Sequence, residues 1–256
     1  MNREHRQLDY GLRFDWGLPG AKAVGAAADV AVVVDVLSFT TTLTVAVDAG
    51  IDVLPYRWND DSAERYARES DAVLAVGRSR AANGQISLSP NTIRRTTAPR
   101  RLVLPSPNGS SICFELGAAA GVCVGASLRN ATAVAGWISR HYTPTSVVSV
   151  IAAGEKWPGG ELRPAIEDLW GAGAVMSALT ATGWDAEASP EALMAVTAWR
   201  AVADTLPQSL TESASGRELR AAGYPEDVVI AGEVDRSTAV PVLEDGVFRG
   251  RVNRRR

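Results

Sequence analysis

Residues Ala31–Thr44 read AVVVDVLSFTTTLT, a β-branched apolar run that ends at Asp35 and continues into hydroxyl side chains. Such a run predicts a buried strand that leads through a turn into the N-terminus of a helix. A helix N-terminus favours anions, because its first amide hydrogens are unpaired and the helix dipole is positive there. The hydroxyls that follow the strand belong to Ser38, Thr40, Thr41 and Thr42.

This combination of groups suits metal-assisted phosphate chemistry. Asp35 supplies a carboxylate for a hard cation, and the hydroxyls and amides supply donors for a phosphate. A simpler interpretation is equally open at this point, in which the strand is buried and Asp35 only caps the helix.

The composition is that of an ordinary globular protein. The chain has 256 residues, 46% of them hydrophobic and 21% charged, enough to bury a substantial core. We expect one domain over residues 1–256, with an elaborated C-terminal third from about residue 190 and a frayed basic tail, RGRVNRRR. The net charge of −3 argues against a dedicated nucleic-acid binder.

The sequence predicts neither a secretory signal nor a membrane-spanning segment. Its N-terminal stretch MNREHRQLDYGLRFDWG is charged and lacks the apolar core of a secretory signal. No apolar run is long enough to cross a bilayer. We therefore expect a cytoplasmic protein without a membrane partner, in which Cys113 and Cys123 are buried and reduced.

Short β-rich runs alternate with longer helical segments along the chain. This rhythm predicts a three-layer α/β/α fold with a largely parallel or mixed central sheet, whose ligands gather beyond the carboxyl ends of the strands. The predicted strands are Val30–Leu37, Asp52–Tyr56, Ala72–Val76, Leu102–Pro105, Val122–Val124 and Val147–Ile151. The predicted helices are Thr40–Ala49, Asp60–Glu69 (capped by Asp60 or Asp61), Ser110–Ala119, Asn130–Arg140 (capped by Asn130) and Ala165–Ala181. The polar segment Gly77–Thr97 is predicted to be a functional loop.

A second polar cluster follows the strand that ends at Pro105. Pro105–Ser111 reads PSPNGSS and precedes a helix, so Ser106, Asn108, Gly109 and Ser110 are candidate phosphate ligands. An Asn-Gly pair permits a tight turn with exposed amides, which suits an oxyanion. The alternative is a plain turn with serine caps.

Two further clusters occupy comparable positions. Gly125–Asn130, GASLRN, offers Arg129 as a bidentate anion clamp with Asn130 beside it, although a solvent-facing arginine is the commoner case. Glu155 follows another strand, and Glu167 and Asp168 open a later helix. Carboxylates of this kind suit Mg²⁺, while Glu167 and Asp168 also complement a helix dipole.

The last cluster is Ser215–Glu218, SGRE. Helix capping accounts for its serine and glutamate, and leaves Arg217 as a candidate anion ligand. The chain has no P-loop, GxGxxG, GxSxG or HExxH motif, and His5 and His141 lie outside the clusters.

Taken in order, these segments resemble the 2-phosphosulfolactate phosphatase family. The resemblance runs over nearly the whole chain: VVVDVLSFTTTL, LSPN, LPSPNGSS, GASLRNATAVA, AAGE with IEDLWGAGAV, and SASGRELRAAGYPEDV. It implies Mg²⁺-dependent removal of phosphate from 2-phospho-3-sulfolactate. Asp35 would be the catalytic carboxylate and a metal ligand together with Glu155, Glu167 and Asp168.

The chain departs from the family pattern at three places. Ser38-Phe39 stand where Arg-Ala is common, and Gly77-Arg78 where Gly-Glu is common. Ser106–Ser110 replaces Thr-Thr-Asn-Gly-Thr. These departures leave open a different small phosphorylated substrate, or a metabolite-binding protein that has lost the metal.

The tryptophans leave the oligomeric state open. Five of them, Trp137, Trp157, Trp170, Trp184 and Trp199, are spread over the second half of the chain. Aromatic side chains of this kind serve either a homo-oligomeric interface or the core.

Overall fold

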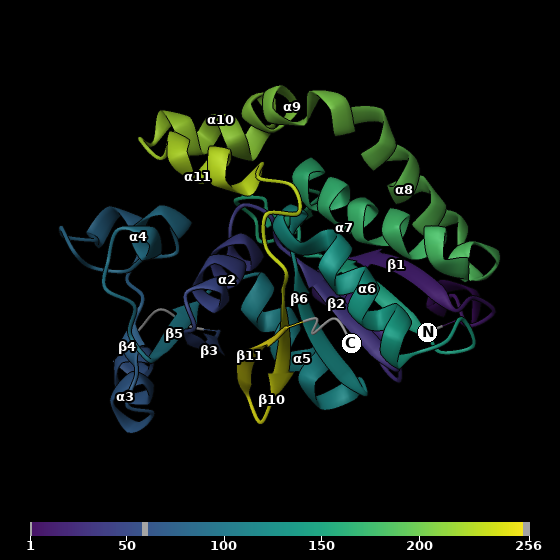
Figure 1. Ribbon diagram of the computed structural model, residues 1–256, viewed down its shortest axis with the longest axis horizontal. Helices are drawn as coiled ribbons and strands as arrows, with labels where there is room; N and C mark the ends of the chain where they lie inside the picture. Colours follow the sequence, from purple (N-terminus) through teal and green to yellow (C-terminus); the bar gives the residue numbers. More distant parts are fainter. Residues whose placement is uncertain (1, 58–60, 253–256) are drawn as a thin grey trace.

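The computed structural model describes residues 2–57 and 61–252. At its centre is a nine-stranded mixed sheet with helices on both faces, a three-layer α/β/α arrangement that confirms the predicted fold class (Figure 1). Across the sheet, the strands are β1 (Leu12–Trp16), β7 (Val148–Ala152), β2 (Val30–Val34), β6 (Val122–Ala126), β10 (Ala239–Glu244), β11 (Val247–Val252), β3 (Asp52–Tyr56), β5 (Arg101–Pro105) and β4 (Val73–Leu74).

Two groups of parallel strands make up this sheet. β1, β7, β2 and β6 run parallel to one another, as do β3, β5 and β4. The antiparallel hairpin β10–β11 lies between the groups and pairs with β6 on one side and β3 on the other. At its turn, Asp245 and Gly246 have φ angles of 51° and 76°, as a two-residue hairpin turn requires.

Strand β2 is buried on both faces, because side chains alternate along a strand. Val30, Val32 and Val34 join a core with helices that include α6 (Ala131–His141), α7 (Ile166–Leu179) and α8 (Pro190–Val202). Ala31 and Val33 face a second core with α2 (Phe39–Asp48) and α5 (Gly109–Ala119). The continuous apolar run in the sequence thus reflects a strand between two helical layers.

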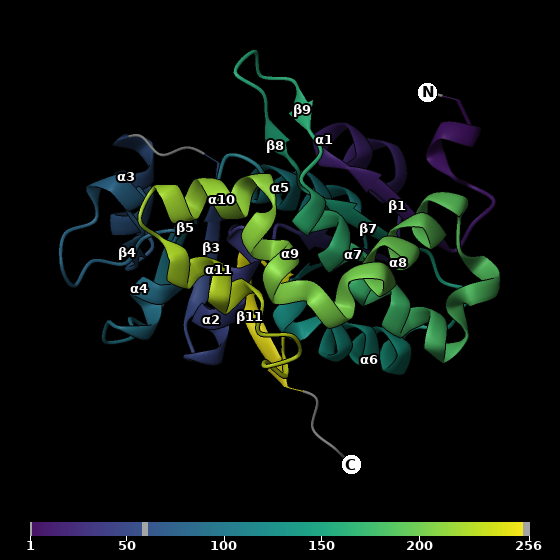
Figure 2. The ribbon, with the colours of Figure 1, turned by 90° about the horizontal axis from the view of Figure 1, so that it is seen from above.

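The other helices border the sheet. They are α1 (Gly17–Gly20), α3 (Asp61–Glu69), α4 (Pro90–Arg94), α9 (Leu206–Glu212), α10 (Ala214–Ala221) and α11 (Pro225–Ala231). α9 to α11 lead the chain from α8 back toward α4, over the top of Figure 1. A small hairpin, β8 (Glu155–Lys156) with β9 (Leu162–Arg163), projects from the body (Figure 2).

The structure confirms all six predicted strands and five predicted helices, with shifted ends. The first strand stops at Val34, before Asp35, and the alternative helix cap Asp60 lies outside the described residues. The prediction of a frayed tail is wrong for Arg249–Val252, which pair in β11; Asn253–Arg256 lie outside the described residues. The loop Gly77–Thr97 contains a 3₁₀ turn, η3 (Arg78–Arg80), and α4.

Other expectations can be compared with the burial of the side chains. Cys113 and Cys123 are buried and free, as expected. Trp184 and Trp170 are buried, Trp137 and Trp199 pack partly against the core, and Trp157 is exposed. Among the described residues, no helix has the length and apolarity that crossing a membrane requires.

The contact between α7 and α8 depends on a glycine. A Cβ at Gly173 would lie 2.1 Å from the backbone oxygen of Ala195 and 2.8 Å from Trp199 Cβ. Gly173→Ala is therefore expected to lower the free energy of unfolding by about 3 kcal/mol, because backbone must move to make room. Urea denaturation measures the change.

Gly136→Ala in α6 is the matched control. Its Cβ would meet only the end of the Arg140 side chain, at 3.8 Å. Alanine is the better helix former, so this variant should gain about 0.5–1 kcal/mol. Equal effects of the two substitutions would contradict the packing argument.

Candidate active site

Asp35 lies immediately after β2 and joins three elements. Its Oδ1 accepts a hydrogen bond from the Phe39 amide at 3.0 Å, and its Oδ2 accepts one from the Gly109 amide at 3.1 Å. The side chain is 6% exposed. Asp35 therefore caps α2, as the simpler interpretation predicted, and at the same time receives the first amide of α5.

Asp168 in the first turn of α7 joins the ends of β2 and β7 in the same way. The Val36 amide donates to its Oδ1 at 2.7 Å, and the Gly154 amide donates to its Oδ2 at 2.9 Å. The carboxyl ends of β2, β5 and β7 consequently meet around two buried carboxyl groups.

Glu155 and Glu167 complete what we call the carboxylate cluster (Asp35, Glu155, Glu167 and Asp168). Asn108 Nδ2 donates to Glu155 Oε2 at 3.0 Å, which brings the loop after β5 to the base of the β8–β9 hairpin. Glu167 is 2% exposed, and no hydrogen bond or ion pair joins its side chain to another described residue.

The carboxylate cluster holds more negative charge than its surroundings neutralise. Burial raises the pKa of Asp35 to about 6, against hydrogen bonds from Phe39 and Gly109 that lower it. Burial and repulsion from Asp35 raise the pKa of Glu155 to about 7. For Asp168, burial and then repulsion from Asp35 and Glu167 raise the pKa well above its ordinary value.

A cation would relieve this repulsion, and the donors are the oxygen ligands that Mg²⁺ prefers. Within residues 2–57 and 61–252, no three or more His, Cys, Asp or Glu side chains are grouped so that together they could hold a metal ion. Mg²⁺ commonly binds through one or two carboxylates plus waters and substrate phosphate. The chemistry of the carboxylate cluster is compatible with a magnesium ion in that mode, for which Asp35 and the unpartnered Glu167 could be the ligands.

The predicted hydroxyl ligands are placed nearby but have backbone partners. Thr40, Thr41 and Thr42 donate to the carbonyls of Asp35, Val36 and Leu88, respectively. Ser110 donates to the Leu104 carbonyl. Thr40, Thr41 and Ser110 thus fix the turns next to Asp35 and Gly109, while Thr42 ties α2 to the segment before α4.

Ser106 borders a cavity next to the carboxylate cluster, and Ser38 contacts Arg78 in the wall of that cavity. Ser106 lines this cavity of about 420 Å³ together with Arg57 and Arg78. Arg78 Nη2 donates to Ser38 Oγ at 2.5 Å, and its positive charge acts on Asp35. We call this cavity, lined by Arg57 and Arg78, the arginine cavity.

Arg57 was not among the site residues predicted from the sequence. The signal was available, because Arg57 directly follows the predicted strand Asp52–Tyr56, and ligands gather at strand ends.

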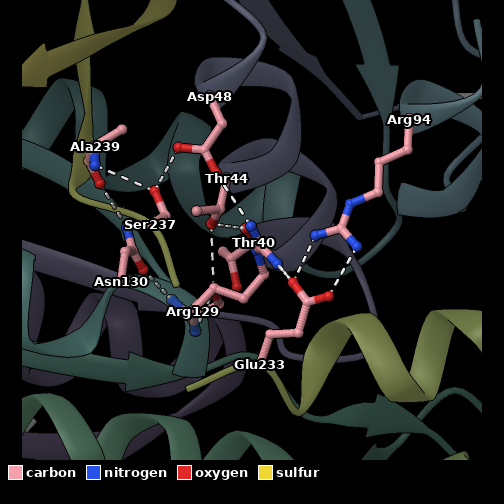
Figure 3. Close-up of polar contacts among 10 residues, drawn as sticks. Thr40, Thr44, Asp48, Arg94, Arg129, Asn130, Glu233, Ser237 and Ala239 are labelled. Atoms are coloured by element: carbon pink, nitrogen blue, oxygen red, sulfur yellow. Dashed lines mark hydrogen bonds and ion pairs between the residues drawn. The ribbon is translucent and has the colours of Figure 1, made fainter. Parts of the chain in front are cut away.

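Arg129 is placed in a different network (Figure 3). Its guanidinium is 3% exposed, and it pairs with Glu233 through Nη1 and with Asp48 through Nη2, the latter at 3.1 Å. Arg94 also pairs with Glu233, and Ser237 donates to Asp48. The structure does not bring Arg129 to the carboxylate cluster; it ties α2 to the segments after β6 and α11.

Asn130 serves the same region of the fold. Its Oδ1 accepts from the Ser127 amide at 2.8 Å, and its Nδ2 donates to the carbonyls of Ala239 and Gly125. Asn130 stands at the N-cap position of α6, as predicted, but its side chain makes no capping hydrogen bond to that helix. Asn130 instead closes a capping box with Ser127 over the 3₁₀ turn η4 (Leu128–Asn130).

The predicted turn at Ser215–Glu218 lies inside α10. Ser213, not Ser215, caps this helix by accepting from the Gly216 amide at 3.0 Å. Ser215 accepts from Arg163 Nη2 at 3.3 Å, while Arg217 is exposed on a surface hollow with Arg220 and Pro225. The structure does not join Arg217 to the carboxylate cluster.

The chain is similar to proteins of one family over most of its length. A family model described as 2-phosphosulpholactate phosphatase matches residues 20–246. A Thermus thermophilus protein named "Probable 2-phosphosulfolactate phosphatase" is 32% identical over 232 residues, or 89% of this chain and 91% of that protein. A Deinococcus radiodurans protein of the same name is 27% identical over 228 residues, or 85% and 89%.

The match spans every strand end that contributes to the carboxylate cluster, and it defines the chain as a phosphoric monoester hydrolase. More narrowly, the chain belongs to the 2-phosphosulfolactate phosphatase family.

The raised pKa values predict how stability changes with pH. The folded state keeps protons on Asp35 and Glu155 up to pH values of about 6 and 7, whereas the unfolded chain loses them near 3.8 and 4.5. The free energy of unfolding should therefore fall as the pH rises from about 4 to 7, by roughly a few kcal/mol in EDTA. Urea denaturation across this pH range measures it.

Glu155→Gln should flatten this pH dependence, because it removes one of the two groups. Glu161→Gln, at an exposed position beside β9, is the control and should leave the dependence unchanged. Stability that rises over the same interval would contradict the charge assignment.

Proposed function

We propose that the chain is a Mg²⁺-dependent phosphatase that hydrolyses 2-phospho-3-sulfolactate to 3-sulfolactate and phosphate. The observation that carries this proposal is the meeting of four carboxyl groups, contributed from the ends of β2 and β7 and the start of α7, next to a cavity lined by arginines. Family membership supplies the reaction class.

The chain's own residues would act at the phosphoryl group as follows. The amides of Phe39 and Gly109 hold Asp35 in one orientation at the end of β2. Asp35 and Glu167 would be the ligands of Mg²⁺, and Asp168 would keep the loops after β2 and β7 together through its two amide bonds. A preorganised site of this kind stabilises the charge of the transferring phosphoryl group without rearranging.

When bound, Mg²⁺ neutralises phosphate charge and orients the groups that react. In the reaction itself, the bond between phosphorus and the lactate oxygen breaks, water supplies the new oxygen on phosphorus, and the lactate oxygen ends protonated.

The assay for this proposal measures phosphate release from 2-phospho-3-sulfolactate by purified protein. We expect release with Mg²⁺ and its loss when EDTA is added, because the buried carboxylates alone repel a phosphate dianion. A panel of other small phosphate esters tests the substrate. No release from any of them, with or without Mg²⁺, would overturn the proposal. Binding without turnover and without Mg²⁺ would favour a metabolite-binding protein.

Asp35→Asn tests the residue at the centre of the site. We expect kcat to fall by about 10³-fold or more, since the substitution removes the negative charge that faces the reacting group. Phosphate release under saturating substrate measures the loss.

Asp29→Asn is the matched control. Asp29 stands at the other end of β2, and its Oδ2 accepts from the Val147 amide at 2.7 Å. Like Asp35, Asp29 flanks β2 and accepts a backbone amide, but it lies at the end of the strand away from the carboxylate cluster. The kcat of Asp29→Asn should therefore be unchanged. If both variants keep wild-type turnover, Asp35 has no part in the reaction.

A further inference from the structure

The arginine cavity lies against the carboxylate cluster and has the opposite charge. Its walls come from the ends of β3, β4 and β5, from η3 and from the segment before α11; they consist of Arg57, Ala75, Val76, Gly77, Arg78, Ser79, Leu88, Pro105, Ser106, Pro107 and Tyr224. No Asp or Glu is among these lining residues. Ser106 and Pro107 lead directly to Asn108 and Gly109, which bind Glu155 and Asp35.

Arg57 brings an unsatisfied positive group to this cavity. Its Nε is buried and has no hydrogen-bond partner within the part of the chain that the structure describes. The guanidinium carbon lies 4.0 Å above the centre of the Phe114 ring, an arrangement that holds the planar group in one orientation. A buried donor in this state lacks an acceptor that a bound anion would supply.

Arg78 is held more firmly, yet it also keeps a free donor. Its Nε donates to the buried Asp227 at 3.1 Å, and Ser89 donates to the other oxygen of Asp227. Its Nη2 donates to Ser38, while its Nη1 has no partner among the described residues. Asp227 neutralises one of the two guanidinium groups, so the cavity retains net positive charge.

We propose that the arginine cavity binds the sulfonate of the substrate, with Arg57 and Arg78 as its ligands. This inference rests on the proposed function, whose reacting phosphoryl group occupies the carboxylate cluster. A sulfonate is ionised at all relevant pH values and has three acceptor oxygens, which match planar guanidinium donors.

Besides its phosphate, the substrate has two anionic groups, the carboxylate and the sulfonate. The shape of the substrate indicates which of the two binds in the arginine cavity. In 2-phospho-3-sulfolactate the carboxylate is attached directly to the carbon that bears the phosphate, whereas the sulfonate extends one methylene further. The sulfonate thus reaches deeper into a neighbouring cavity, and the side chains of Ala75, Val76 and Leu88 provide apolar surface for the methylene.

Calorimetry with the reaction product tests this assignment without turnover. Protein with Mg²⁺ is titrated with 3-sulfolactate, with lactate and with inorganic phosphate. Arg57→Gln should weaken 3-sulfolactate binding by about 10- to 100-fold, the range expected for a charge-assisted hydrogen bond, and should leave phosphate binding unchanged. Arg80→Gln is the control, because Arg80 is exposed, lies two residues from Arg78 and does not line the cavity.

Kinetics provide an independent readout. Arg57→Gln should raise the KM for 2-phospho-3-sulfolactate by a similar factor and leave the KM for 2-phospholactate, which lacks the sulfonate, unchanged. If Arg57→Gln does not fold, Arg57→Lys keeps the charge but loses the planar fork, and Phe114→Leu removes the ring that orients it. Both variants should weaken 3-sulfolactate binding.

The outcomes separate this inference from the proposed function. Wild-type protein that binds 3-sulfolactate through Arg57 but releases no phosphate overturns the function and supports the cavity assignment. Phosphate release with 3-sulfolactate affinity unaffected by Arg57→Gln overturns the cavity assignment alone. Weakened binding of inorganic phosphate, with 3-sulfolactate unaffected, places the phosphoryl group in the cavity and also overturns it.

Discussion

The hydrogen bond from the Gly109 amide to Asp35 Oδ2 holds the two halves of this protein at one site. Asp35 follows β2 in one parallel group of strands, and Gly109 follows β5 in the other, across the β10–β11 hairpin. The contact admits no side chain at residue 109: a Cβ there would lie 2.7 Å from Asp35 Oδ2 and 2.4 Å from Phe39 Cδ1. The glycine of the PSPNGSS motif is thus required for close approach, beyond any role in a turn.

Opposite charges are kept side by side rather than paired. In the carboxylate cluster, Asp35 and Asp168 accept backbone amides, Glu155 accepts an asparagine, and Glu167 has no such partner. The arginines of the cavity retain unpaired donors. Elsewhere among the described residues, the charge of the buried Arg129 is paired with Asp48 and Glu233 through its Nη atoms, although its Nε also lacks a hydrogen-bond partner. Because unpaired buried charge is unfavourable for folding alone, its concentration in one region is typical of a functional site.

The parts of the fold that follow from local pattern were predictable. The run at Ala31–Val34 predicts a strand buried on both faces. Because Asp35 directly follows this run, its carboxylate lies at the carboxyl end of the strand. The β10–β11 hairpin was missed, although Asp245-Gly246 between two apolar segments is a strong turn signal. The Pro241 in AVPVLE obscured the strand, because proline is rarely found inside a central strand.

The site residues that were hardest to predict are those whose partners are distant in sequence. Arg129 follows a strand as an anion ligand would, but Glu233, 104 residues later, takes its guanidinium. The threonines after Asp35 offer hydroxyls in the sequence, yet backbone carbonyls take them: Thr40 and Thr41 donate to carbonyls of the preceding turn, and Thr42 donates to the distant Leu88. Residue type and position at a strand end therefore predict which side chains are candidates for a site. Which of these remain available to a ligand depends on their partners in the folded structure.

The same reasoning connects two site residues, Ser38 and Arg78, that are far apart in the sequence. Ser38 and Arg78 are separated by 40 residues, but they are joined by a hydrogen bond. A serine at position 38 is short enough to leave room for a guanidinium that reaches in from the opposite wall, where Asp227 fixes its Nε. The positive charge beside Asp35 therefore comes from Arg78, on the loop that lines the arginine cavity, and Ser38 at the start of α2 holds that guanidinium in place.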